Sequence, residues 1–156
     1  TLFPYTTLFR SVHLSDASFS SPRKLRSFVI DQKGSEPAGF FSPKGDFVVL
    51  WTSNIVEIYN ATSGKLHRKL LEKDYIVDLK FITNRSLMVC SSEDVGNFLR
   101  MFDVISGEHL ATLDIEERPF SLGVCVNSLR VAVCLGGSDV KLIQVHLPRS
   151  RRLSHE

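Results

Sequence analysis

Short apolar segments alternate with polar turn residues along most of the chain. The segments are rich in valine, isoleucine, leucine and phenylalanine, and the longest unbroken apolar runs, such as 47–51 and 131–135, are five residues long. Clusters of serine, asparagine, glycine and proline separate them. No apolar spacing of three or four residues continues for the length of a helix. This pattern predicts an all-β chain built from short strands.

Two segments near the middle of the chain share one motif. Residues 58–66 read IYNATSGKL and residues 101–110 read MFDVISGEHL, 43 positions later. Both contain an apolar residue, an aromatic residue, Asn or Asp, two spacers and Ser-Gly. A weaker third copy, VKLIQV at 140–145, follows about 41 positions on. Self-similarity at this period is typical of a repeated supersecondary unit, so we expect the fold to consist of units of about forty residues.

Each unit divides into four expected strands with turn residues between them. In the first unit, Pro43 and Gly45 favour a turn after the first strand, and Ser63-Gly64 favours a turn before the fourth. The strands are expected at 38–42, 47–52, 55–61 and 66–71, then at 76–83, 87–91, 98–105 and 109–113, and then at 121–126, 129–135 and 140–147. Two further strands, at 12–17 and 24–31, belong to a preceding unit.

The repeats resemble those of WD40-repeat β-propellers. Tyr59-Asn60, Phe102-Asp103 and Ile143-Gln144 stand where that family has Trp-Asp. Residues 41–45 (FSPKG) resemble the family's Phe-Ser-Pro-Asp-Gly turn, and residues 136–140 resemble the turn into the third strand, where Asp139 corresponds to an often buried aspartate. The family's Gly-His dipeptide is absent, because residues 73–75 and 117–119 occupy its places. We therefore expect the family's Asp-His-Ser-Trp hydrogen-bond network to be missing.

The resemblance implies an all-β, WD40-like propeller fragment of about three four-stranded blades. The blades are expected at 12–32 (partial), 36–72, 75–115 and 119–148 (partial), followed by a basic tail at 149–156. Because a propeller ring usually has at least four blades, we expect the ring to be incomplete. An N-terminal strand could fill the missing outer strand of the last blade, but we favour further blades of the full-length chain as the missing partners.

Residues 1–11 (TLFPYTTLFRS) do not belong to the repeat. All eleven positions match the in-frame translation of a widely used sequencing-library adapter, and the first residue is threonine rather than methionine. We therefore exclude this segment from the fold prediction. The natural protein is expected to be longer.

The composition excludes several classes of protein. Hydrophobic residues make up 43% and charged residues 23%, which is typical of globular chains and not of disordered ones. No apolar run approaches the ~20 residues of a membrane span, so no membrane insertion is expected. The formal net charge of +2 gives no reason to expect a nucleic-acid partner. Three cysteines without a CxxC pair favour a reducing, cytoplasmic location over a disulfide framework.

Candidate catalytic groups do not form a recognisable motif. The five histidines have neither HxH nor HExxH spacing, and His67 and His109 are expected on exposed outer strands. Cys90, Cys125 and Cys134 lie within apolar segments, so we expect them to pack in the core. The glycines at 136–137 are expected in a hairpin turn, because no P-loop lysine or helix follows. We therefore predict no catalytic residue, no metal site and no cofactor.

These observations favour a non-enzymatic module for protein–protein interaction or ligand sensing. The repeats resemble those of NACHT-and-WD-repeat signalling proteins, which implies that a larger signalling chain contains them. The alternative is a fragment of a propeller-containing enzyme, such as a hydrolase whose catalytic part lies elsewhere. The expected partner-contact residues lie in polar loops, which carry function in rigid β folds: Lys73, Asp74, Tyr75, Glu93, Asp94, Glu117, Arg118 and Pro119.

The tail carries one further candidate site. Arg151 and Arg152 precede Ser154 in a pattern that resembles the substrates of basophilic protein kinases. An acidic kinase groove can pair with both guanidinium groups and present the serine hydroxyl. Ser154 is therefore a candidate phosphorylation site.

Overall fold

The computed structural model describes residues 10–15, 24–30, 38–71, 74–93 and 96–147, and the chain divides into two compact units, Thr1–Pro37 and Ala38–Glu156. In the first unit, β1 (Arg10–Ser15) pairs antiparallel with β2 (Lys24–Ile30). Strand β1 begins two residues earlier than expected, within the segment that resembles an adapter. Backbone pairing explains this difference, because it requires no particular side chain.

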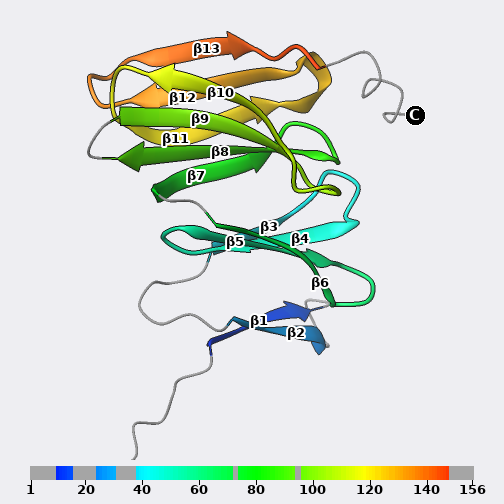
Figure 1. Ribbon diagram of the computed structural model, residues 1–156. Helices are drawn as coiled ribbons and strands as arrows, with labels where there is room; N and C mark the ends of the chain where they lie inside the picture. Colours follow the sequence, from blue (N-terminus) through cyan, green and yellow to red (C-terminus); the bar gives the residue numbers. More distant parts are fainter. Residues whose placement is uncertain (1–9, 16–23, 31–37, 72–73, 94–95, 148–156) are drawn as a thin grey trace, which may run out of the picture. The chain divides into compact units, whose positions relative to one another are not determined.

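The second unit contains three antiparallel sheets, which we call blades 1, 2 and 3 (Figure 1). Blade 1 consists of β3 (Ala38–Phe41), β4 (Phe47–Trp51), β5 (Ile55–Asn60) and β6 (Leu66–Leu71). Blade 2 consists of β7 (Tyr75–Phe81), β8 (Ser86–Glu93), β9 (Gly96–Asp103) and β10 (His109–Ile115). Blade 3 consists of β11 (Pro119–Cys125), a short 3-10 turn (Val126–Ser128), β12 (Arg130–Leu135) and β13 (Val140–Gln144). In each blade, strands adjacent in sequence are adjacent in the sheet.

The strands lie where the sequence pattern predicts them, with differences at their ends. Strand β7 stops before Thr83, because the Thr83 hydroxyl accepts hydrogen bonds from the backbone amides of Arg85 and Ser86 and so begins a turn. Strand β13 stops at Gln144, whose side-chain amide donates to the Ser128 carbonyl at 3.0 Å. Polar side chains that bond to nearby backbone groups therefore end these strands earlier than the apolar pattern suggests.

The Ser-Gly motif forms the same turn in blades 1 and 2. Asn60 Oδ1 accepts a hydrogen bond from the Ser63 amide at 2.7 Å, and Asp103 Oδ1 accepts one from the Ser106 amide at 2.8 Å. The following glycines, Gly64 and Gly107, have φ angles of 67° and 74°, a region that favours glycine. The recurrence of this motif in the sequence therefore reflects a recurring local hydrogen-bond pattern.

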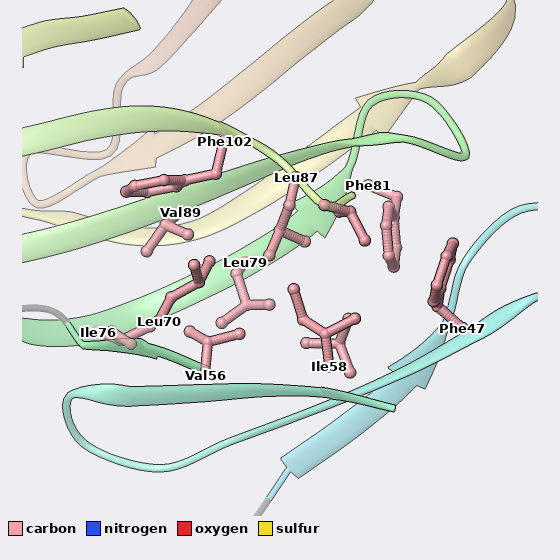
Figure 2. Packing of buried hydrophobic residues seen from close by; sticks show 12 residues of the cluster. Phe47, Val56, Ile58, Leu70, Ile76, Leu79, Phe81, Leu87, Val89 and Phe102 are labelled. Carbon is pink, nitrogen blue, oxygen red and sulfur yellow. The ribbon is translucent and has the colours of Figure 1, made fainter. Parts of the chain in front are cut away.

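The apolar side chains of blades 1 and 2 form one core between the two sheets (Figure 2). Val56 and Ile58 of β5 pack in the same cluster as Leu79 and Val89 of blade 2, and all four are fully buried. Burial of one such side chain contributes about 1.5–3 kcal/mol. The contact between blades is therefore a main source of stability for this unit.

A second core lies between blades 2 and 3. Leu99 and Met101 of β9 pack in one cluster with Val131 and Val133 of β12. Blade 2 thus contributes apolar side chains to a core on each of its faces. Within the described ranges, the structure contains no helix with the length and hydropathy that a bilayer-spanning segment requires.

Candidate functional site

The antiparallel order of the strands divides the connections of the second unit between two ends. The connections between blades and those between second and third strands lie at one end, which we call the loop end; its described parts include residues 53–54, 74–75, 116–119 and 136–139. The remaining turns lie at the opposite end, the turn end. In Figure 1 the loop end is on the left of blades 2 and 3.

All six described members of the predicted partner-contact set lie at the loop end. Three of them are exposed, namely Tyr75 (59%), Glu117 and Arg118. Glu93 ends strand β8, where its backbone pairs with Gly96. The remaining two described residues, Asp74 and Pro119, are buried. Lys73, Asp94 and the candidate phosphorylation site Ser154 lie outside the described residues.

Asp74 is buried and pairs with a charged side chain of blade 2. Arg100 Nη1 of β9 donates to Asp74 Oδ2 at 2.7 Å and to Ser91 Oγ at 2.9 Å. The Arg100 guanidinium also lies 4.7 Å from the ring centroid of Phe98. This ion pair joins the loop before β7 to the middle of the sheet, so it fixes the base from which Tyr75 projects.

A buried charge lies in blade 1 at the position equivalent to that of Arg100. Glu57, 43 residues before Arg100, accepts a hydrogen bond from the Tyr59 hydroxyl at 2.8 Å and pairs with Lys69 at 3.1 Å. Burial, together with the hydrogen bond to Glu57, raises the pKa of Tyr59. Glu57 and Arg100 are therefore both committed to partners within their own blades.

Pro119 is buried at the start of β11, and the next residue is the most exposed aromatic of the loop end. The pairing of β11 with β12 shifts between Pro119 and Ser121, so Phe120 lies in a β-bulge and is 61% exposed. The Gly136 amide donates to the Arg118 carbonyl at 3.0 Å and holds the bulge against the β12–β13 turn. The apolar pattern predicts the start of this strand at Ser121 and therefore does not single out Phe120.

A cleft of about 330 Å³ opens at the loop end beside this bulge. Its lining residues are Ile115, Glu116, Glu117, Leu135, Asp139, Val140 and Lys141. Asp139 is exposed, so the expectation of a buried aspartate at this position is wrong. The Leu135 amide bonds to the Asp139 backbone carbonyl at 2.9 Å, which forms the predicted hairpin turn and leaves the carboxylate in solvent.

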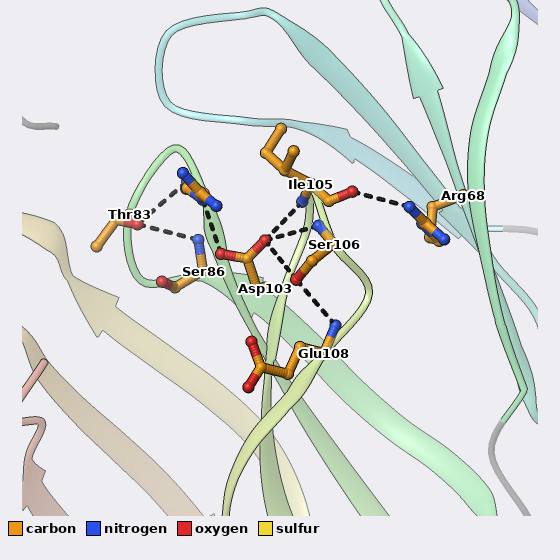
Figure 3. A network of polar contacts seen from close by, with 8 residues as sticks. Arg68, Thr83, Ser86, Asp103, Ile105, Ser106 and Glu108 are labelled. Carbon is orange, nitrogen blue, oxygen red and sulfur yellow. Dashed lines mark hydrogen bonds and ion pairs between the residues drawn. The ribbon is translucent and has the colours of Figure 1, made fainter. Parts of the chain in front are cut away.

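The turn end contains a fully buried carboxylate that accepts several hydrogen bonds (Figure 3). Asp103 is fully buried, and Arg85 Nε donates to its Oδ2 at 2.7 Å, while the amide and hydroxyl of Ser106 donate to Oδ1. Burial alone would raise the pKa of Asp103, but the hydrogen bonds from Ser106 and Arg85 outweigh it and hold the pKa below its ordinary value. This carboxylate is committed to the turn and is not available as a general acid or base.

An adjacent contact at the turn end links two blades. Arg68 Nη2 of β6 donates to the Ile105 carbonyl in the β9–β10 turn at 2.9 Å. A side cleft of about 360 Å³ lies nearby, lined by Asp46, Phe47, Asn60, Thr62, Thr83, Asn84, Arg85 and Ile105. Asn84 bridges the blades across this region, since its Nδ2 donates to Asp46 Oδ2 at 2.7 Å. The turn end is therefore held together by polar contacts between blades.

The candidate metal ligands and nucleophiles are dispersed. Among the described residues, no group of three or more His, Cys, Asp or Glu side chains could hold a metal ion. His67 and His109 lie exposed on β6 and β10, as expected. Cys90 is buried and Cys134 is half-buried, but Cys125 is exposed, so its predicted place in the core is wrong. Cys125 is the last residue of β11, where the strand leaves the core for the turn.

The cysteines are expected to differ strongly in reactivity. Hydrogen bonds from Ser128 lower the pKa of Cys125, whereas burial raises the pKa of Cys90 to about 12. Because the thiolate is the reacting form, iodoacetamide at neutral pH should label Cys125 first and Cys90 only after unfolding. Peptide mass mapping over time measures both rates. A Ser128→Ala variant should slow the labelling of Cys125 and leave Cys134 unchanged; equal labelling of Cys90 and Cys125 in the folded chain would contradict the assignment.

Comparison with known proteins identifies the fold. No protein-family model matches the sequence, and no curated protein matches it. Among solved structures, the β-propeller domain of Myceliophteria thermophila Cps50 (Swd1) is similar, with a TM-score of 0.71 and 12% sequence identity. The alignment covers 87% of this chain and 47% of that one, so the chain spans about half the length of the propeller domain that it matches.

The likeness agrees with the architecture predicted from the repeats. The described residues form a WD40-like propeller fragment with an open ring, composed of two four-stranded blades and one three-stranded blade in the second unit. The predicted fold class is therefore confirmed. At this level of identity the comparison concerns the fold alone.

Proposed function

We propose that the chain is a protein-interaction scaffold whose partner binds the loop end. The observation that carries the proposal is the pair of exposed aromatic side chains there, Tyr75 at 59% and Phe120 at 61%. Aromatic residues dominate the energetics of protein interfaces, because they bury a large area at a small cost in conformational entropy. The coarse scaffold role also agrees with the WD40-like fold.

The surroundings of these aromatics support the same proposal. Tyr75 follows Asp74, which the Arg100 ion pair holds, and Phe120 lies in a bulge fixed by the β12–β13 turn. Both rings therefore project from a rigid base, which reduces the entropy lost on binding. Glu117 and Arg118 are exposed beside them and supply a polar rim. We include in this rim three further residues of the predicted partner-contact set, Lys73, Glu93 and Asp94.

The finer assignments extend this proposal. We infer that the blades belong to a cytoplasmic, NACHT-type signalling protein, in which they sense a ligand or a partner. In this proposal residues 12–148 form the propeller fragment, residues 149–156 are a basic tail and residues 1–11 derive from an adapter. Their support is the resemblance of the repeats and of the first eleven residues. No contact among the described residues favours the hydrolase alternative, since the buried carboxylates Asp74, Glu57 and Asp103 are all paired with basic side chains.

A paired set of variants tests the loop-end proposal. Tyr75→Ala with Phe120→Ala should reduce the capture of bound proteins from cells of the source organism at least tenfold, measured by quantitative mass spectrometry. The matched control, Phe41→Ala with Ile105→Ala, removes two exposed apolar side chains from the turn end. It should retain the partners of the original chain. Equal capture by both double variants, at unchanged thermal midpoints, would overturn the proposed surface.

A further inference from the structure

In blades 1 and 2 a fourth strand covers the outer edge of the third strand. Among the described residues, blade 3 has no such fourth strand. In blades 1 and 2, the third strands β5 and β9 lie between two neighbours, whereas the only neighbour of β13 among the described residues is β12. One row of backbone amide and carbonyl groups of β13 therefore faces outward. An edge of this kind is a template for pairing with another strand.

The spacing of the other blades indicates which segment can occupy this edge. Five residues separate β5 from β6 (61–65), and five separate β9 from β10 (104–108). The same spacing after Gln144 places the start of a fourth strand at Ser150. Seven residues, 150–156, then remain, and β6 and β10 are six and seven residues long. We propose that residues 150–156 add to β13 as the fourth strand of blade 3.

The register of this pairing follows from the two complete blades. In both blades the register shifts once near the turn between the third and fourth strands. On the far side of this shift from the turn, Ile58 is opposite Arg68 in blade 1 and Met101 is opposite Ala111 in blade 2. The equivalent pairing in blade 3 places Arg152 opposite Leu142. Leu142 is 74% exposed, so the alkyl part of the arginine side chain can cover apolar surface there. Ser154, the candidate phosphorylation site, then lies opposite Val140.

The described start of the connection after β13 differs from the turns of blades 1 and 2. Blades 1 and 2 use Asn60 or Asp103 and a glycine of positive φ to close the turn. Blade 3 has Gln144 instead, whose Oε1 accepts a hydrogen bond from Arg130 Nε at 3.2 Å and whose amide donates to the carbonyls of Ser128 and Leu129. Because Gln144 does not supply the hydrogen bond that closes the turns of blades 1 and 2, we expect the fourth strand to be held mainly by its pairing with β13, so that it can leave the edge.

Disulfide trapping tests the register directly. In a Cys125→Ser, Cys134→Ser background, Leu142→Cys with Arg152→Cys should form an intrachain disulfide under mild oxidation, because directly opposite residues in a sheet have Cβ atoms about 4.5–5.5 Å apart. The control, Leu142→Cys with Glu156→Cys, displaces the second cysteine by four residues, or about 13 Å. The in-register pair should form at least tenfold faster, as measured by peptide mass mapping. Equal rates, or covalent dimers in which a second copy occupies the edge, would overturn the proposal.

Hydrogen exchange provides an independent measurement in the unmodified chain. A chain that ends at Leu147, and the full chain with Leu153→Pro, should both exchange the outward amides of β13 at least tenfold faster than the original protein. The amides of β8 and β9 should remain equally protected in all three proteins, which establishes that blade 2 stays folded. Unchanged exchange in β13 would show that the tail does not cover its edge.

Discussion

Replacement of Asp103 by alanine is expected to lower the free energy of unfolding by about 3 kcal/mol. The side chain is fully buried, and it accepts hydrogen bonds from the Ile105 amide at 3.0 Å, from the Ser106 amide and hydroxyl, and from Arg85 Nε. Alanine would leave these donors without their acceptor at the β9–β10 turn. Urea unfolding monitored by far-ultraviolet circular dichroism measures the loss.

The matched control is the same turn position in blade 1. Asn60→Ala removes an acceptor that is half-buried and bonds to the Ser63 amide, so we expect a loss of about 1 kcal/mol. Asp103→Asn keeps the shape of the side chain but removes the charge that pairs with Arg85. Its loss in free energy of unfolding should lie between those of the two alanine variants. Losses of equal size for Asn60→Ala and Asp103→Ala would contradict a special role for the carboxylate.

The pH dependence of stability follows from the same carboxylate. Its pKa in the folded chain is below the ordinary value of 3.8, because the hydrogen bonds from Ser106 and Arg85 outweigh the effect of burial. The unfolded state therefore binds its proton at higher pH than the folded state. The stabilisation is complete above about pH 5 and is lost as the pH falls through the folded pKa. The difference in unfolding midpoint between the original chain and Asp103→Asn should shrink correspondingly in acid.

Local chemistry explains why so much of the fold was predictable. The Ser-Gly turns after Asn60 and Asp103 depend on residues within four positions of each other, so the motif identifies both the turn and the strand before it. The hairpin at 136–139 was predictable for the same reason. The four-stranded units followed from these turns, because short apolar segments joined by tight turns pair most readily with their neighbours in sequence.

The parts of the site that escaped prediction depend on contacts between distant residues. Phe120 is exposed because the register of β11 shifts against β12, which no local pattern indicates. Asp74 and Arg100 are 26 positions apart, and their pairing requires the sheet to be folded. One signal was nevertheless present in the sequence. Glu57, Arg100 and Lys141 place a charge at the same position of an apolar strand in each repeat.

Substitution of one repeated apolar position should have very different effects in the three blades. The repeat spacing gives this position one residue in each blade: Ile58, Met101 and Leu142. Each lies opposite a residue of the second strand of its blade, which is Val49, Met88 and Ala132, respectively. Ile58 is fully buried and Met101 is 6% exposed, whereas Leu142 is 74% exposed. Alanine should cost about 3–4 kcal/mol at Ile58, about 3 kcal/mol at Met101 and less than about 0.5 kcal/mol at Leu142.

The physical reason for this gradient is the open ring. Ile58 and Met101 belong to the cores between neighbouring blades, but no blade among the described residues packs on the face of blade 3 that carries Leu142. A fourth strand on the β13 edge places the alkyl part of Arg152 beside Leu142 but packs no apolar layer over it, so the small effect at Leu142 is expected with or without that strand. Chemical unfolding of the three alanine variants in the 156-residue chain measures the gradient. A cost at Leu142 equal to that at Met101 would mean that another chain segment, or a second copy, covers this face.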